Sequence, residues 1–187
     1  ALKDFNDVKK GDLGGWIEKE GNLSHDGNCW VYDNACVFGN AHVYCNARIY
    51  SNAHVYGNAY VYGDVYVYDN ARVYNNTCVC GNARVYGNAQ VYDDACVYGD
   101  VHVYGYACVY NDANIKSKFD IISFNGFGTE ARTTTAYRCK DNLIKIKCGC
   151  FNGALEEFRK QIKETRKGKY AEEYLLIADV IERHFRE

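Results

Sequence analysis

A six-residue repeat constrains this chain more than any other feature. Residues 27–116 divide without insertion into fifteen hexads, of which "VYGNAYVYGDVYVYDNARVY" at residues 55–74 is typical. Val or Ile stands at the fifth position of every hexad, Ala at the third position of most, and Gly, Asn or Asp at most first and second positions. A strict period of six over so long a stretch indicates a solenoid of stacked coils.

The repeat also assigns each hexad position to a face. Because strand side chains alternate, the third and fifth positions point one way and the fourth and sixth the other. The small Ala and the branched Val therefore face inward, and the variable residue and the Tyr face outward. The first two positions form a corner, where Gly, Asn and Asp tolerate positive φ. A ladder of hairpins is the alternative, but it gives no reason for a period of six.

The pattern V-Y-G-N-A-x resembles the hexapeptide repeat of left-handed parallel β-helices, in which three hexads make one triangular coil. The resemblance implies the left hand, since parallel crossovers are otherwise right-handed. Fifteen hexads would make about five coils. The fold class we expect is mainly β: a left-handed parallel β-helix with a small α+β C-terminal domain.

Two further stretches resemble known proteins. Residues 4–35, "DFNDVKKGDLGGWIEKEGNLSHDGNCWVYDNA", are similar to the N-terminal part of YdcK-like hexapeptide-repeat proteins. The combination "RTTT…KCGCFNGALEEF" at residues 132–158 resembles repeat proteins carried by phages and prophages. The second resemblance implies a non-catalytic binding protein in the host cytoplasm, which inhibits host defence by blocking a protein or sequestering a nucleotide. A structural virion component is a further alternative.

The character of the sequence changes at both ends of the array. Residues 1–26 are polar and Gly-rich, and we interpret them as an N-terminal cap. Residues 27–116 form the β-helix. Residues 117–187 are expected to be an α+β domain of short strands followed by helices at about 154–166 and 170–185, where apolar residues recur at helical spacing. Gly168 marks the break between the two helices.

Charge and hydropathy exclude some classes of partner. The formal net charge is −2, which gives no field for binding nucleic acid. No apolar run approaches the roughly 18 residues of a membrane helix. We therefore expect a cytoplasmic protein that contacts neither membrane nor nucleic acid. The chain opens on Ala1 instead of an initiator Met, so we expect it to be a processed form or to lack its original start.

Histidine suggests the main enzymatic alternative. Many hexapeptide-repeat proteins are trimeric acyltransferases with a catalytic His between subunits, and His42, His54 and His102 occupy outward fourth positions. That position is variable here, and the array has no extruded loop to close over an acyl donor. We therefore predict no catalytic residues, no cofactor and no enzymatic activity, with acyltransferase as the alternative.

Ten cysteines raise the questions of disulfides and metal. Solenoid stacking places Cys78 beside Cys96, within reach of a disulfide. Cys148 and Cys150, with Cys139, could form half of a zinc site, although structural zinc usually takes four ligands at wider spacing. We favour buried reduced thiols and predict no metal.

Tyrosine, present 18 times, repeats in register at the sixth hexad position. Residues 18 apart stack in neighbouring coils, where aromatic rings stabilise one another. Tyr is also enriched in interfaces. We therefore expect a homo-oligomer, trimer or dimer, with one tyrosine ladder as its interface: Tyr32, Tyr50, Tyr68, Tyr86 and Tyr104.

A Gly-rich loop followed by threonines is the best candidate for a ligand site. The stretch "NGFGTEARTTTAYR" at residues 125–138 offers backbone and hydroxyl donors to an anion. Lys145 and Lys147 alternate with Ile144 and Ile146, which would put both lysines on the solvent side of a strand. An ordinary hairpin with a Gly turn is the structural alternative. The predicted site, for an anionic small ligand or a host protein, comprises Arg132, Thr133, Thr134, Arg138, Lys145 and Lys147.

Overall fold

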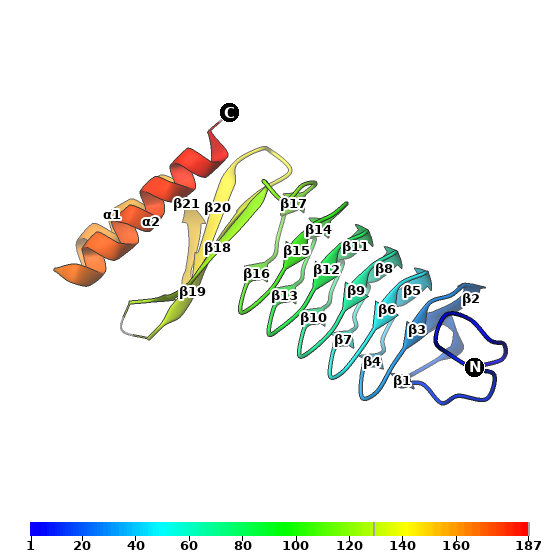
Figure 1. Ribbon diagram of the computed structural model, residues 1–187. Coiled ribbons are helices and arrows are strands. Elements are labelled where there is room, and N and C mark those ends of the chain that lie inside the picture. Colours follow the sequence, from blue (N-terminus) through cyan, green and yellow to red (C-terminus); the bar gives the residue numbers. More distant parts are fainter. Residues whose placement is uncertain (129, 187) are drawn as a thin grey trace.

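The computed structural model describes residues 1–128 and 130–186. Thr129, in the Gly-rich loop, and Glu187, at the end of the predicted C-terminal domain, lie outside the described residues. The chain forms a parallel β-solenoid, then a four-stranded sheet, then two helices packed on that sheet (Figure 1). The predicted mainly-β solenoid with a small C-terminal domain is confirmed.

Three stacks of short parallel strands make the three sides of the solenoid. The first contains β1 (Trp16–Ile17), β4 (Cys36–Val37), β7 (His54–Val55), β10 (Arg72–Val73), β13 (Gln90–Val91) and β16 (Cys108–Val109). The second contains β2 (Leu23–Gly27), β5 (His42–Cys45), β8 (Tyr60–Gly63), β11 (Cys78–Gly81), β14 (Cys96–Val97) and β17 (Asn114–Ile115). The third contains β3 (Trp30–Val31), β6 (Arg48–Ile49), β9 (Tyr66–Val67), β12 (Arg84–Val85) and β15 (His102–Val103).

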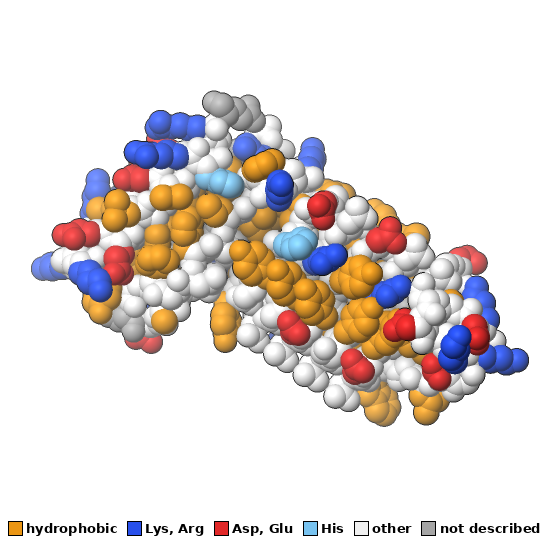
Figure 2. All heavy atoms as spheres, viewed as in Figure 1, with side chains coloured by type: hydrophobic (Ala, Val, Ile, Leu, Met, Phe, Trp, Pro, Cys, Tyr) orange, Lys and Arg blue, Asp and Glu red, His pale blue; other side chains and the backbone are white. Residues whose placement is uncertain are grey.

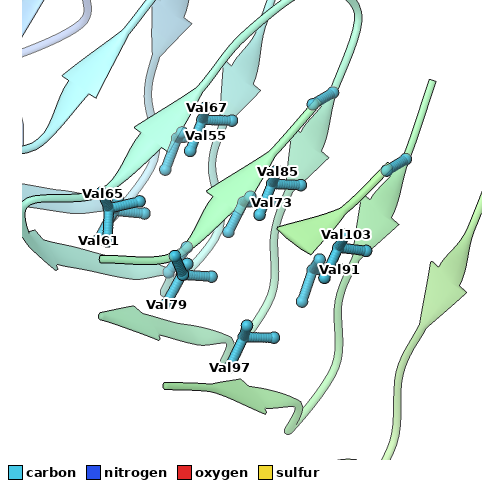
Figure 3. Close-up of a cluster of buried hydrophobic side chains, with 14 of the residues drawn as sticks. Val55, Val61, Val65, Val67, Val73, Val79, Val85, Val91, Val97 and Val103 are labelled. Atoms are coloured by element: carbon cyan, nitrogen blue, oxygen red, sulfur yellow. The ribbon is translucent and has the colours of Figure 1, made fainter. Parts of the chain in front are cut away.

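The interior of the solenoid is filled by the third and fifth positions of the hexads. Val55 pairs in register with Val73, and Val73 with Val91, so each coil adds one valine to a column (Figure 3). Ala59 and Val61 are fully buried, whereas Tyr60 between them is 47% exposed. The predicted inward and outward faces are confirmed.

The corners depend on the first residue of each hexad. Every such residue from Gly27 to Asn111 has positive φ, including Cys45 (φ 60) and Ser51 (φ 57). At Gly81 (φ 79) an added Cβ would lie 2.7 Å from the backbone N of Gly99 in the next coil, so close stacking as well as φ requires glycine there. The second position has ordinary φ and instead forms side-chain ladders, such as Asn70 Nδ2 donating to Asn88 Oδ1 at 3.3 Å.

The solenoid has more coils than the hexads alone predict. Two of its stacks hold six strands and the third holds five, because β1 pairs with β4 and β2 with β5. β1, β2 and the 3₁₀ turn η1 (Glu20–Asn22) come from the predicted cap, whose sequence lacks the hexad pattern. The estimate of about five coils is therefore one short. This first turn is recognisable only from its backbone pairing with the coil that follows.

The C-terminal region adds an antiparallel sheet with strand order β18 (Ile121–Phe127), β19 (Arg132–Arg138), β20 (Ile144–Cys148), β21 (Phe151–Ala154). Helices α1 (Leu155–Thr165) and α2 (Lys169–Phe185) follow, separated by Gly168 with φ 56. Arg159 joins the helices through ion pairs to Asp179 and Glu182. Neither described helix is long and apolar enough to cross a membrane.

Candidate functional site

The four-stranded sheet lies between the last coil and the helices, so both of its faces are covered (Figure 1). Tyr137 and Cys139, from one face, belong to the same buried cluster as the solenoid valines. Ala136, Ile146 and Cys148, from the other face, pack with α1 and α2. Alternation along β19 and β20 therefore sorts side chains between two covered surfaces.

This arrangement changes the expected position of the lysines. Lys145 pairs across strands with Tyr137, and directly opposite residues share a face, so Lys145 faces the solenoid. Its Nζ lies 2.6 Å from Asp112 Oδ1 in the last coil. Lys147 Nζ lies 5.6 Å from the ring centroid of Tyr110. The expectation that both lysines lie on a solvent-facing side is wrong, because the last coil covers that side.

Two other predicted site residues lie on the helix-facing side and have partners within the protein. Thr134 is buried, and its hydroxyl donates to Cys148 Sγ at 3.2 Å. Arg138 Nε donates to Asp120 Oδ1 at 3.0 Å, and the guanidinium lies over the ring of Phe185. These contacts secure the sheet. A ligand-binding role for either residue stays a prediction.

The remaining predicted residues meet at a groove where the sheet joins the solenoid. This junction groove has a volume of about 510 Å³. Arg132 extends across Gly149, where an added Cβ would lie 2.7 Å from Arg132 Nη1. The Thr133 hydroxyl is 2.8 Å from Asn125 Oδ1, to which it donates. The groove is lined by Tyr106, Cys108, Glu130, Ala131, Arg132, Thr133, Thr135, Lys147 and Gly149.

The solenoid contributes two lining residues that the sequence analysis missed. Tyr106 is 66% exposed and occupies the second position of its hexad, where most hexads have Asn or Asp. That departure is a signal visible in the sequence. Cys108 has a raised pKa because burial disfavours its thiolate, and the Lys147 charge only partly offsets this effect. Its backbone N–H donates to Thr135 Oγ1 at 3.4 Å, which links the coil to β19.

The three outward histidines lie on three different sides of the solenoid and differ in surroundings. His42 stacks on Tyr60, with ring centroids 5.4 Å apart, and His54 meets the edge of Phe38. His102 lines a recess of about 310 Å³ between the solenoid and β18, together with Asp100, Lys118 and Ser123. No hydrogen bond from His102 to a carboxylate occurs among the described residues. His42 also lines a recess of about 310 Å³, together with Ser24 and Asp26.

The three cysteines considered for a zinc half-site do not come together. Cys139 lies on the solenoid-facing side of the sheet, Cys148 faces the helices and Cys150 is exposed, so they form no zinc half-site. Cys78 and Cys96 are in register, and both thiols are free. Within residues 1–128 and 130–186, one group of three metal-binding side chains occurs, Asp112, Cys139 and Asp141, and the Lys145 ammonium already contacts its Asp112.

The tyrosines stack as expected, and Figure 2 shows hydrophobic side chains, a class that includes tyrosine, gathered in a band over the solenoid. We call the ladder that begins at Tyr32 the first ladder. A second ladder is continuous, with ring centroids 4.8 to 4.9 Å apart, and consists of Phe38, Tyr56, Tyr74, Tyr92 and Tyr110. In the first ladder Tyr32 stacks on Tyr50 at 4.3 Å, and Tyr68 on Tyr86 at 4.8 Å. An interface role for the first ladder stays a prediction.

Comparison with known proteins identifies the repeats. A family model described as YdcK Beta solenoid repeat matches residues 65–81, 79–91 and 89–105. The protein named "Uncharacterized acetyltransferase YdcK" of Escherichia coli (strain K12) is 58% identical over 33 residues, a match of 18% of this chain and 10% of the relative. The chain thus spans about 10% of the length of this curated relative. Residues 65–105 carry YdcK-like β-solenoid repeats.

Proposed function

We propose that this protein acts by binding, not catalysis, and that the junction groove takes an anionic ligand of the nucleotide class. One observation supports this most: two cationic side chains, Arg132 and Lys147, and an exposed tyrosine ring, Tyr106, line the same groove. Cationic side chains are the usual donors to phosphate, and an aromatic ring can stack on a base.

The charges support the choice of an anion. Lys145 and Arg138 are neutralised by Asp112 and Asp120. Arg132 and Lys147, in contrast, form no ion pair within the described part of the chain. An Arg guanidinium binds phosphate with two parallel hydrogen bonds, and a Lys ammonium adds a point charge. Glu130, on the rim of the groove, can accept hydrogen bonds from the amino or hydroxyl groups of such a ligand.

The cellular setting of the proposal comes from resemblance. The similarity of residues 132–158 to phage and prophage repeat proteins suggests that the protein works in the cytoplasm of a host cell. There it would inhibit host defence by sequestering a nucleotide signal. Blockage of a host protein is the other form of this proposal, and it predicts that no nucleotide binds.

Titration calorimetry with a panel of linear and cyclic nucleotides, with inorganic phosphate alongside, tests the proposal. We expect Arg132→Gln and Lys147→Gln each to weaken nucleotide binding about tenfold, because each removes one charged contact. The matched control is Lys163→Gln, which removes an exposed lysine of α1. Unchanged affinity in both groove variants, or no binding of any nucleotide by the parent, would contradict the proposal.

An acyltransferase is the second candidate, for two reasons. The curated relative is named an acetyltransferase, and His102 shares its recess with Asp100, Lys118 and Ser123. A histidine base beside polar groups can activate an acyl acceptor. The test is turnover of acetyl-CoA by the parent and by a variant with His42, His54 and His102 all changed to Gln. Turnover that disappears in this variant would establish the second candidate over the first.

A further inference from the structure

The first tyrosine ladder is interrupted at one step. Tyr32 and Tyr50 stack with centroids 4.3 Å apart, Tyr68 and Tyr86 at 4.8 Å, and Tyr86 and Tyr104 at 5.5 Å. Between Tyr50 and Tyr68, both within the described residues, no ring contact occurs. The Tyr68 ring therefore stacks on one face only.

The second ladder shows that the interruption is a local feature and not a property of the coil spacing. Its four steps from Phe38 to Tyr110 have ring centroids 4.8, 4.8, 4.9 and 4.8 Å apart and interplanar angles of at most 2°. Both ladders are built on coils of the same length. The interruption of the first ladder must therefore be caused by the side chains beside Tyr50.

Arginine at the neighbouring outward position accounts for the displaced ring. Arg48 Nη1 donates to Tyr50 Oη at 3.4 Å. The Tyr50 ring lies parallel to Tyr66, with centroids 6.1 Å apart at 4°, instead of stacking on Tyr68. Tyr66 in turn lies between two guanidinium groups, with Arg48 Cζ 5.7 Å and Arg84 Cζ 5.5 Å from its centroid. These cation–π contacts hold Tyr66 and its neighbours in this arrangement.

The interruption opens a hollow of about 440 Å³, which we call the ladder recess. Arg84 is exposed, and among the described residues it forms no ion pair. The lining includes one carboxylate, that of Asp33, whose Oδ2 accepts a hydrogen bond from the backbone N–H of Ser51 at 3.2 Å. The recess is lined by Asp33, Tyr50, Ser51, Tyr66, Tyr68 and Arg84.

We propose that the ladder recess binds a planar aromatic anion. Its ring would stack on the free face of Tyr68, in the place that Tyr50 would occupy in an uninterrupted ladder. Its negative group would meet Arg84. Aromatic walls recognise any flat ring, and the single guanidinium selects rings that carry a carboxylate, sulfonate or phosphate. The site lies apart from the junction groove and does not depend on the function proposed for it.

Naphthalene-2-sulfonate is a suitable probe because it has a flat ring and one permanent charge. Affinity would be measured by titration calorimetry, and two further ligands separate the contributions. Cyclohexanesulfonate retains the charge without a flat ring, and 2-naphthol retains the ring without the charge at pH 7. We expect both to bind at least about tenfold more weakly than the probe, since stacking and the charged contact each contribute about that factor.

Variants locate the site. Tyr68→Leu and Arg84→Gln should each weaken probe binding about tenfold. The matched controls are Tyr74→Leu, in the uninterrupted second ladder, and Arg72→Gln, an exposed arginine on that side. Both controls, and the groove variant Lys147→Gln, should leave the affinity unchanged. Arg84→Gln alters an exposed side chain and keeps the test valid even if Tyr68→Leu disturbs the fold.

Three results would overturn the proposal. The first is a parent protein that does not bind the probe, and the second is equal weakening by the recess variants and their controls. The third concerns self-association. If Tyr68→Leu lowers the molar mass measured by light scattering without any probe, the recess is a contact between copies of the chain.

Discussion

Lys145 and Asp112 form an ion pair of 2.6 Å that joins the C-terminal sheet to the last coil of the solenoid. The pKa of Asp112 is lowered, chiefly by the hydrogen bond from Lys145, and the pKa of Lys145 is raised, chiefly by the same bond. The Lys145 side chain is 29% exposed and the Asp112 side chain is 37% exposed, so solvent screens the interaction between their charges. It is a modest tether between two structural units.

Removal of this pair should reduce stability slightly and change its pH dependence. We expect Lys145→Ala to lower the free energy of unfolding by about 0.5–1 kcal/mol, as for other partly exposed pairs. The Asp112 contribution is present above its unfolded pKa, near 3.8, and is lost as pH falls through the lower folded value. The Lys145 contribution is present below the unfolded pKa of Lys145, near 10.5, and is lost as the pH rises through its higher folded pKa.

Denaturant unfolding between pH 3 and pH 11 checks this prediction. The disadvantage of the variant relative to the parent should be largest between these limits and should shrink as the pH falls below 3.8 or rises above 10.5. Lys9→Ala is the control, because the Lys9–Asp4 pair is exposed by 69% and 60%. If Lys145→Ala and Lys9→Ala have the same effect at pH 7, the pair does not join the two units.

Tyr137 carries the one buried side-chain oxygen that lacks a hydrogen-bond partner in the described residues. Burial raises the pKa of Tyr137. The buried hydroxyl also has no hydrogen bond to replace those that it makes to water in the unfolded chain. Tyr137→Phe should therefore be neutral or stabilise the protein by up to about 1 kcal/mol. Tyr137→Ala should destabilise it by about 3–5 kcal/mol, since it leaves a cavity beneath the last coil. Thermal melting of the two variants distinguishes these outcomes, and a marked loss in Tyr137→Phe would reveal an unrecognised hydrogen bond.

The sequence was sufficient for the solenoid because its constraints are local. Inward Val61, outward Tyr60 and the corner at Gly81 each follow from the position within the hexad. Even Cys45 and Ser51, which disfavour positive φ, were correctly placed at corners by register alone. The turn containing Trp16 was missed because it forms by pairing with Cys36 and not through a repeat.

The candidate site was only partly predictable. Alternation correctly put Lys145 and Lys147 on one face of a strand, but it does not say what covers that face. The last coil does so, which pairs one lysine with Asp112 and leaves the other at the groove. The missing ring contact between Tyr50 and Tyr68 could not be predicted from the sequence either, because it depends on the direction that the Arg48 side chain takes.

A pair of adjacent substitutions tests the packing of the solenoid. Val61 is fully buried, and Tyr60 is 47% exposed. Val61→Asp would place a carboxylate without a partner in the interior, at a cost of several kcal/mol. Tyr60→Asp should be mild, since it loses only an outward stacking contact with His42. Equal lowering of the melting temperature by the two changes would contradict the assignment of faces.

The cysteines should differ widely in reactivity. Burial raises the pKa of Cys78 to about 11 and of Cys139 to about 12, so at pH 8 about one molecule in a thousand or fewer carries either thiolate. Cys45 and Cys150 are exposed. Iodoacetamide at pH 8 should therefore alkylate Cys45 and Cys150 first and reach Cys78 and Cys139 only after unfolding. Peptide mass spectrometry over a time course measures this order.

Repetition of the alkylation with zinc present tests the metal hypothesis in the same experiment. Cys148 and Cys139 lie on opposite faces of the sheet, so zinc should not protect these two thiols together, whereas Cys148 and Cys150 line the same pocket. Unfolding in denaturant provides the control, because all ten thiols should then react at similar rates. If zinc slows alkylation of Cys148 and Cys139 together in the folded protein, the result contradicts their placement on opposite faces, and the sheet must open to bring them together.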